Sequence, residues 1–249
     1  MKRPPKVLQG IRSALFNFGM YGATAILAIV GLPLLVLPAR FTVAFSRLWA
    51  QVVLALLALT CGLRHQVRGQ ENLPDGPLIV ACKHQSTWET LSLAVLVKQP
   101  AFVIKRDLMC IPIFGWYLAR ARSIAVDRRG RASALRRMLK SARAIVDQGR
   151  PIVIFPEGTR AKLGASLPYQ PGIAAVYSQL NLPVVPVALN SGVFWGRRTF
   201  VKWPGTITVE FLPAIPPGLK RDEFMQTLRQ RIDSATDRLV AEAQAEIRS

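Results

Sequence analysis

The chain has 249 residues, of which 51% are hydrophobic, and its formal net charge is +19. A soluble nucleic-acid-binding protein with this charge would normally be less apolar, so the composition argues against nucleic acid as a partner. An apolar and basic chain instead suits an anionic membrane, where each Lys or Arg near the surface contributes about 1 kcal/mol. The basic character belongs to residues 1–220, because residues 221–249 hold five Arg against six Asp and Glu, a net of −1.

Two uncharged runs near the start of the chain predict membrane-associated helices. Residues 13–39 lack charged side chains and are long enough to cross a bilayer of about 30 Å, whereas the run at residues 48–63 is shorter. Two true spans and a hairpin that dips into one leaflet both fit these runs. Basic residues at the two outer ends put those ends on the cytoplasmic side in either case. Arg40 and Arg47 lie at the bend and favour the shallow hairpin.

Turn-forming residues between Glu71 and Pro77 separate this front segment from the rest of the chain. We therefore expect residues 1–68 to form a membrane-associated helical hairpin, at the cytoplasmic face of the inner cell membrane, and residues 69–249 to form an α/β domain. In that domain apolar runs of strand length alternate with helical patterns, which predicts a mostly parallel central sheet flanked by helices. The predicted strands are Leu78–Cys82, Ala101–Ile104, Ser123–Val126, Ile152–Phe155, Val184–Leu189 and Thr206–Phe211. The predicted helices are Thr90–Lys98, Ile113–Ala121, Ala132–Gln148, Gly172–Leu180 and Arg221–Ile247.

Three cysteines, Cys61, Cys82 and Cys110, lie far apart in apolar surroundings. Their odd number and wide spacing indicate neither a disulfide framework nor a zinc site, and we expect buried thiols. An acyl-cysteine intermediate at Cys82 is conceivable but disfavoured, because Lys83 and His84 are the only nearby cations that could lower the pKa of its thiol.

A histidine and a glutamate five residues apart form the first candidate site. His84 follows an apolar run that ends at Cys82 and precedes a helical pattern that starts at Thr90. Residues five apart on a helix point about 140° apart, so His84 and Glu89 meet only if His84 lies in the turn and Glu89 in the first helical turn. Glu89 would then fix the imidazole tautomer and leave the other nitrogen as a general base. Ser86 and Glu89 also match a capping box, so Glu89 is alternatively a helix cap.

A second block, Phe155-Pro156-Glu157-Gly158-Thr159-Arg160, follows another predicted strand. Ligands of parallel sheets bind at the carboxyl ends of the strands, where both blocks fall. Gly158 lets the backbone approach a ligand closely, and the planar fork of Arg160 suits a phosphate. Glu157 either binds a substrate hydroxyl or orients an arginine, and we favour a positioning role.

The two blocks in this order, His84-x-x-x-x-Glu89 and then Phe155 to Arg160, resemble the glycerolipid acyltransferase family, the 1-acylglycerol-3-phosphate acyltransferases and their relatives. The family pattern has Asp where this chain has Glu89, and the resemblance covers roughly residues 78–192. It implies a membrane-bound O-acyltransferase that moves an acyl chain from acyl-CoA or acyl carrier protein to the free hydroxyl of lysophosphatidic acid, which gives phosphatidic acid. The sequence contains no metal-binding or dinucleotide motif, so we expect no cofactor beyond the acyl donor.

The resemblance also assigns roles to individual residues. It makes His84 the base and Glu89 its support, and it includes Glu157, Gly158 and Thr159 in the substrate-binding block. In this family a basic residue after the second strand and an arginine after the third hold the phosphate of the acceptor, and Lys105 and Arg128 match these two positions. Together with Arg160 of the second block, they form a predicted phosphate-binding cluster. The resemblance places Val185–Leu189 at the acyl site, although a purely buried strand fits that segment nearly as well.

Other acceptors and one other class of function remain open. The acceptor could be a lyso-ornithine lipid, another lysophospholipid or glycerol 3-phosphate. A non-catalytic basic membrane adaptor is the alternative from a different class, and it leaves the spacing of His84 and Glu89 unexplained. Ser86 as a nucleophile is less favoured than direct attack by the acceptor, because Ser86 has a capping role. His65 is expected at the surface.

Overall fold

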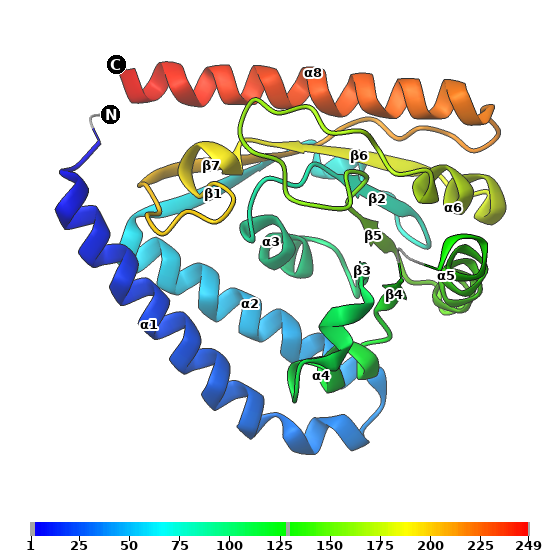
Figure 1. The fold of residues 1–249 in the computed structure, drawn as a ribbon, viewed down its shortest axis with the longest axis horizontal. Helices are drawn as coiled ribbons and strands as arrows, with labels where there is room; N and C mark the ends of the chain where they lie inside the picture. Colours follow the sequence, from blue (N-terminus) through cyan, green and yellow to red (C-terminus); the bar gives the residue numbers. More distant parts are fainter. Residues whose placement is uncertain (1–2, 128–129, 249) are drawn as a thin grey trace.

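The computed structural model describes residues 3–127 and 130–248. Within these residues the chain forms a seven-stranded sheet with the order β1-β7-β6-β2-β5-β3-β4 (Figure 1). All six predicted strands are present, and their ends lie within one residue of the predicted ends. The strands are β1 (Leu63–Arg68), β2 (Ile79–Cys82), β3 (Ala101–Lys105), β4 (Ile124–Val126), β5 (Ile152–Ile154), β6 (Val184–Leu189) and β7 (Gly205–Phe211).

The central strands run parallel, which confirms a mostly parallel sheet. Strands β6, β2, β5, β3 and β4 share one direction. Strand β7 is antiparallel to β6 and carries β1 as its parallel neighbour. The carboxyl ends of β2, β3, β4 and β5 therefore meet at one edge of the sheet, where ligands of such sheets bind.

Strand β1 was not predicted. Its sequence, Leu-Arg-His-Gln-Val-Arg, alternates weakly, and most of its side chains are exposed. It is an edge strand held by backbone pairing to β7 over six residues, from Leu63 to Arg68. An edge strand with a solvent-facing surface lacks the apolar run that marks a buried parallel strand. This strand belongs to the sheet although it precedes residue 69.

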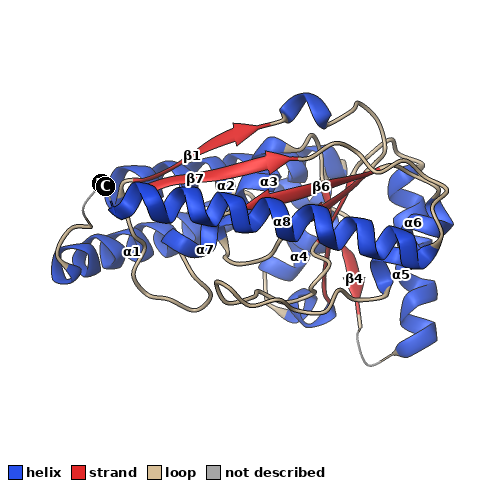
Figure 2. Cartoon of the chain, turned by 90° about the horizontal axis from the view of Figure 1, so that it is seen from above, coloured by secondary structure: helices blue, strands red, loops and turns tan. Residues whose placement is uncertain are grey.

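The helices cover both faces of the sheet, as expected. Helix α8 lies along β6 on one face, and α2 and α3 lie on the other (Figures 1 and 2). The five predicted helices are present with ends within two residues. The helices are α1 (Lys6–Val30), α2 (Ala39–Cys61), α3 (Trp88–Leu96), α4 (Phe114–Arg120), α5 (Arg131–Val146), α6 (Gly172–Leu180), α7 (Ser191–Phe194) and α8 (Arg221–Arg248), with 3-10 helices η1 (Leu32–Val36), η2 (Gln70–Asn72) and η3 (Arg106–Cys110).

The apolar run of β2 explains why both faces are covered. Successive side chains of a strand point to opposite faces. Val80 and Cys82 pack in the cluster that includes α2 and α3, whereas Ile79 and Ala81 pack in the cluster that includes α5, α6 and α8. A strand that is apolar at every position therefore needs a helix layer on each side.

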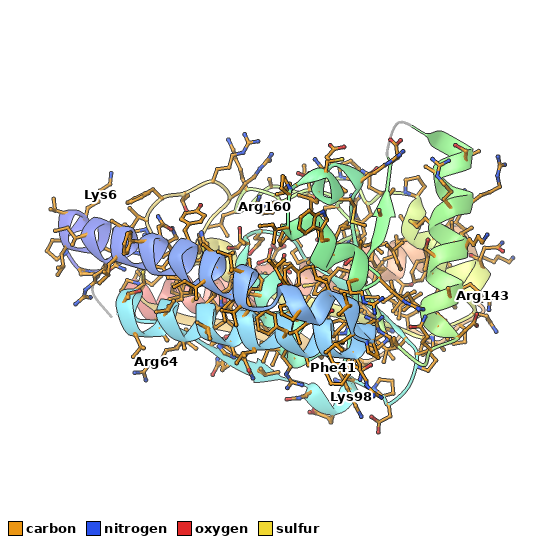
Figure 3. The ribbon with its side chains drawn as sticks, turned by 90° about the horizontal axis from the view of Figure 1, so that it is seen from below. Lys6, Phe41, Arg64, Lys98, Arg143 and Arg160 are labelled. Atoms are coloured by element: carbon orange, nitrogen blue, oxygen red, sulfur yellow. The ribbon has the colours of Figure 1, made fainter. Side chains whose placement is uncertain are left out.

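The hairpin of α1 and α2 lies along the lower face of the molecule, and the two helices run side by side (Figures 1 and 3). By length and composition, each helix could cross a membrane. Helix α1 turns its apolar side chains outward: Val7, Leu15 and Phe18 are 77%, 59% and 81% exposed. Its buried residues are the polar Gln9 and Ser13 together with Phe16. The pattern is the reverse of that of a helix in a water-soluble protein.

Polar contacts attach α1 to the globular domain at both ends. Near its start, the Lys202 N–H donates to Ser13 Oγ at 3.0 Å, and the buried Lys202 Nζ donates to Asn17 Oδ1 at 2.7 Å. Near its end, the Tyr117 hydroxyl of α4 donates to the Ala28 carbonyl at 2.9 Å. The helix is therefore tied along the domain rather than projecting away from it.

Two leucines on α2 test this orientation. Leu57 is fully buried in the main core, whereas Leu59 is 82% exposed. Leu57→Ala should lower the free energy of unfolding by about 2–5 kcal/mol, because it leaves a cavity. Leu59→Ala is the matched control and should change it by less than about 0.5 kcal/mol. Urea unfolding in detergent measures both, and equal losses would contradict the orientation of α2.

Candidate active site

A cavity of about 770 Å³ opens at the carboxyl edge of the parallel strands. Its wall includes His84 after β2, Lys105 at the end of β3, Asp127 after β4, and Thr159 and Arg160 after β5. These residues are far apart in the sequence and share a place because parallel strands end at one edge. Five of the predicted site residues therefore line one cavity: His84, Lys105, Gly158, Thr159 and Arg160.

His84 and Glu89 are in direct contact. His84 lies in the turn after β2, and Glu89 lies in the first turn of α3. His84 Nδ1 is 2.9 Å from Glu89 Oε1, and Glu89 is fully buried. Because a carboxylate accepts, Nδ1 carries the hydrogen and Nε2 keeps its lone pair. The imidazole also stacks on Phe155, with ring centres 4.0 Å apart, which fixes the ring plane. The predicted contact is confirmed with Glu in the place of Asp.

The capping-box interpretation of Glu89 holds in part: Glu89 accepts from the Ser86 N–H as expected, but the residue that precedes α3 is Thr87, and its side chain forms no capping bond. Glu89 Oε1 accepts from the backbone N–H groups of Gln85 and Ser86, both at 2.6 Å. Ser86 Oγ accepts from the N–H of Trp88, the first residue of α3, at 3.2 Å, whereas a full capping box would use the N–H of Glu89. Glu89 Oε2 accepts from the Ser191 hydroxyl at 3.0 Å. One carboxylate therefore builds the turn and orients the imidazole, so the two hypotheses are compatible.

The main chain of His84 is held on both sides, by the second block and by the residue that follows it. Its N–H donates to Glu157 Oε2 at 3.0 Å, and its carbonyl accepts from the Ala161 N–H at 2.7 Å. Glu157 Oε1 forms an ion pair of 2.8 Å with Lys83. Burial raises the pKa of Glu157, although the bonds from Lys83 and the His84 N–H oppose this shift.

Glu157 supports the site from behind the cavity wall. The described wall includes Pro156, Gly158, Thr159 and Arg160 but not Glu157. The favoured positioning interpretation agrees with this geometry, but the residue positioned is His84 and its lysine neighbour rather than an arginine.

Two of the predicted cations line the same cavity. Lys105 and Arg160 both contribute to the wall, whereas Arg128 lies outside the described residues. Arg160 donates to Thr87 Oγ1 at 2.7 Å, which anchors its guanidinium beside the turn of His84. Gly158 has a φ of 64°, a left-handed conformation that favours glycine. The sharp turn at Gly158 directs the two following residues into the wall.

The rest of the wall is largely apolar. Phe102 and Ile104 of β3, Leu135 and Met138 of α5, and Ile173 of α6 enclose it. Strand β6, with Val185–Leu189, is buried throughout and contributes no residue to the described wall of this cavity. The buried-strand interpretation of that segment therefore fits, and the apolar wall comes from other elements.

The thiols differ from the prediction at one position. Cys61 and Cys82 are buried, but Cys110 is exposed, so the expectation of three buried thiols is wrong there. Cys110 ends η3, and its helix leaves the side chain uncovered. Burial raises the pKa of the Cys82 thiol well above its ordinary value, and the carboxylates of Glu89 and Glu157 add to this effect. A thiol so poorly ionised argues against an acyl-cysteine. His65 is exposed, as predicted.

Sequence patterns did not single out Ser191 or Asp233. Ser191 could have been found, because it follows predicted strand 184–189 and so lies at the edge where the site forms. Asp233 contacts Lys83 at 2.9 Å across 150 residues of sequence, and no local pattern marks it. Among the described residues, no group of His, Cys, Asp and Glu side chains could hold a metal ion.

Comparisons with known proteins identify the family of the chain. A family model described as "Acyltransferase" matches residues 64–190. The 1-acyl-sn-glycerol-3-phosphate acyltransferase of Pseudomonas aeruginosa is 33% identical over 238 residues, which cover 94% of this chain and 92% of that protein. A protein of the same name from Chlamydomonas reinhardtii is 30% identical over 67% of this chain and 51% of its own length. The crystal structure of the 1-acyl-sn-glycerophosphate acyltransferase PlsC from Thermotoga maritima has a TM-score of 0.75 at 23% identity, covering 95% of this chain and 98% of that one. The last comparison shows a shared fold.

Glu89 and Ser191 allow a graded test of the buried carboxylate. Ser191→Ala removes the donor to Glu89 Oε2 and should cost about 1–3 kcal/mol of stability and roughly tenfold in turnover. Glu89→Gln keeps the shape but cannot accept at both atoms, and turnover should fall by about 10³-fold or more. Thermal unfolding and steady-state rates measure the two effects. If Glu89→Gln lowered only thermal stability, Glu89 would be a helix cap without a role in turnover.

Proposed function

The chain belongs to the acyltransferase family, and from this premise we propose that it is a 1-acyl-sn-glycerol-3-phosphate acyltransferase. It transfers an acyl chain from acyl-CoA or acyl carrier protein to the free hydroxyl of lysophosphatidic acid, and the product is phosphatidic acid. The observation that carries the proposal is the 2.9 Å contact between His84 Nδ1 and Glu89, which leaves Nε2 with its lone pair on a residue that lines the cavity.

The chemistry follows from this geometry. His84 Nε2 takes the proton of the acceptor hydroxyl as its oxygen attacks the thioester carbonyl. Glu89 stabilises the imidazolium that forms. The tetrahedral intermediate collapses, the C–S bond breaks, and the departing thiolate takes the proton back from His84. The products are the new ester and the free thiol of the donor.

Lys105 and Arg160 hold the acceptor phosphate in this proposal. Both line the cavity with His84, and a phosphate dianion favours a bidentate guanidinium and an ammonium. Gly158 and Thr159 contribute the backbone and hydroxyl of the same wall. Arg128 is assigned to this set by its match to the family pattern. The apolar wall formed by β3, α5 and α6 receives an acyl chain.

The α1–α2 hairpin docks the site on the cytoplasmic face of the inner membrane. The outward apolar face of α1 supports immersion in hydrocarbon, and so do exposed Ile111, Phe114 and Trp116, which lie in α4 or just before it. Because α1 is bonded to the domain at both ends, crossing the bilayer would require the domain to enter it. A shallow hairpin in one leaflet avoids this cost, and it brings the cavity to the headgroup region where a one-tailed lipid resides.

A non-catalytic adaptor accounts less well for the structure. An adaptor needs the basic and apolar surface but has no use for a histidine oriented by a buried carboxylate. A lyso-ornithine lipid remains the second acceptor to test, and it would leave Lys105 and Arg160 without a phosphate.

An acceptor panel with a His84 variant tests the reaction. Purified protein in vesicles should acylate 1-acylglycerol 3-phosphate in preference to lyso-ornithine lipid and other lysolipids. His84→Ala should lower the rate by about 10²–10⁴-fold, the typical contribution of a general base, while vesicle binding is retained. Product formation from labelled donor measures the acceptor preference and the rate, and co-sedimentation with the vesicles measures binding. Turnover retained in His84→Ala would remove this residue as the base.

The phosphate contacts have their own test. Arg160→Ala should raise KM for 1-acylglycerol 3-phosphate by roughly 10–100-fold, because a charged hydrogen bond contributes about 1.5–3 kcal/mol. Arg143→Ala is the matched control, since Arg143 lies on α5, well away from Arg160 (Figure 3). Only the first variant should show the change. A strong preference of the wild type for a phosphate-free lysolipid would contradict the phosphate contacts.

A further inference from the structure

A largely buried chain of charged groups connects α8 with the main chain of His84. Lys83 is 5% exposed and lies between two carboxylates. Its Nζ is 2.9 Å from Asp233 Oδ1 on α8 and 2.8 Å from Glu157 Oε1. Glu157 Oε2 accepts from the His84 N–H at 3.0 Å. We refer to Asp233, Lys83 and Glu157 as the charge relay.

Lys83 keeps its positive charge although it is buried. Burial opposes the charged ammonium, but the bonds to Glu157 and Asp233 outweigh it and raise the pKa of Lys83 above its ordinary value. Tyr169 adds a bond of 3.3 Å from its hydroxyl to Asp233 Oδ1. The lysine is therefore a fixed cation with two fixed partners.

Stability alone gives a weak reason for such a relay. Replacing a buried ion pair by well-packed apolar residues is often neutral or stabilising. Helix α8 is already held by a buried apolar stripe: Phe224, Leu228, Ile232 and Leu239 are fully buried. The ion pairs are thus unnecessary to attach the helix. They do, however, fix the position of the Glu157 carboxylate, which an apolar contact would not do.

The position of that carboxylate matters for the imidazole. The side chain of His84 is oriented by Glu89, and its main chain is held by Glu157 and Ala161. If Glu157 moved, the backbone of the turn could move while the bond to Glu89 persisted. The Nε2 atom would then lie at a different place in the cavity, and a displacement of 1 Å at a reacting group can cost about 10²-fold in rate.

We propose that Lys83 and Asp233 are positioning residues for acyl transfer: Asp233 on α8 holds Lys83, Lys83 holds the Glu157 carboxylate, and Glu157 holds the main chain of His84. This inference rests on the proposed function, because it assigns the relay to the same base. It also excludes Glu157 from contact with the acceptor, so changes in the relay should act on kcat and leave KM alone.

Asp233→Asn is the most informative variant. Asp233 has a 24% exposed side chain, and asparagine keeps its shape and its bond from Tyr169 while removing the charge. We expect kcat to fall on the order of tenfold with KM for the acceptor unchanged. Asp233→Glu, which restores the charge, should recover part of the loss. The double variant Lys83→Met with Asp233→Asn should lose no more kcat than Lys83→Met alone, because both changes break the same connection between α8 and Glu157.

Arg238→Gln is the matched control on the same helix. Arg238 forms exposed ion pairs with Glu210 and Glu242, away from the relay. It should leave kcat within about twofold. An equal loss of kcat in this control would mean that any disturbance of α8 lowers the rate, and it would overturn the relay. A rise in KM at constant kcat in Asp233→Asn would also overturn it, because Glu157 would then act on the acceptor.

Amide hydrogen exchange gives a readout that needs no acceptor. The His84 N–H is bonded to Glu157, so Asp233→Asn should speed exchange of the peptide that contains residues 83–89, and Arg238→Gln should not. Unchanged exchange would contradict the relay whatever the enzyme acylates. Conversely, a wild type that ignores lysophosphatidic acid would refute the proposed acceptor, and the exchange result would still decide whether α8 positions the turn.

Discussion

The fully buried carboxylate of Glu89 is the interaction on which the site depends. A buried carboxylate is costly unless donors surround it, and here the donors are the His84 ring, the backbone of the turn and Ser191. The same bonds that compensate its burial therefore shape the turn and select the tautomer of His84. The extra methylene of Glu relative to Asp does not prevent the contact, since the ring and carboxylate are 2.9 Å apart. The same set of hydrogen bonds thus allows Glu89 to be buried and orients the His84 ring.

The parallel sheet brings the remaining groups to this carboxylate. Strands β2 and β5 are neighbours, so the turn of His84 and the block from Phe155 to Arg160 leave the sheet side by side. The bond from the His84 N–H to the Glu157 carboxylate and the backbone bond from the Ala161 N–H to the His84 carbonyl then join the two segments. This adjacency explains why the two blocks are informative as a pair: the side chain of Glu157 in the second block holds the main chain of His84 in the first.

The sequence predicted elements that depend on local patterns and missed those that depend on distant partners. Fully apolar strands such as β2 and β6 carry their own signal, and so does the capping box at Ser86. Strand β1 is defined by pairing with β7 and has little apolar content. The exposed position of Cys110 and the contact of Asp233 with Lys83 arise from tertiary packing, which no local window contains. The role of Glu157 was ambiguous for the same reason, because its partner depends on the adjacency of β2 and β5.

The polar inner face of α1 joins the proposed chemistry to the proposed membrane contact. Hydropathy alone gives α1 the character of a span, since the helix has 25 residues and is mostly apolar. Most of the side chains that make it apolar are exposed, whereas Gln9, Ser13 and Asn17 bond to the domain. Lys202 is the buried cation at this contact, and it faces the rings of Phe16 and Trp195 at 5.3 and 5.2 Å rather than a carboxylate. The contacts of Lys202 with the two rings and with Asn17 Oδ1 depend on direction, so they hold α1 in one position against the domain. In the proposed membrane contact, a helix held in this way would fix the height of the domain relative to the lipid, so contacts within the protein would determine the distance between the bilayer and His84.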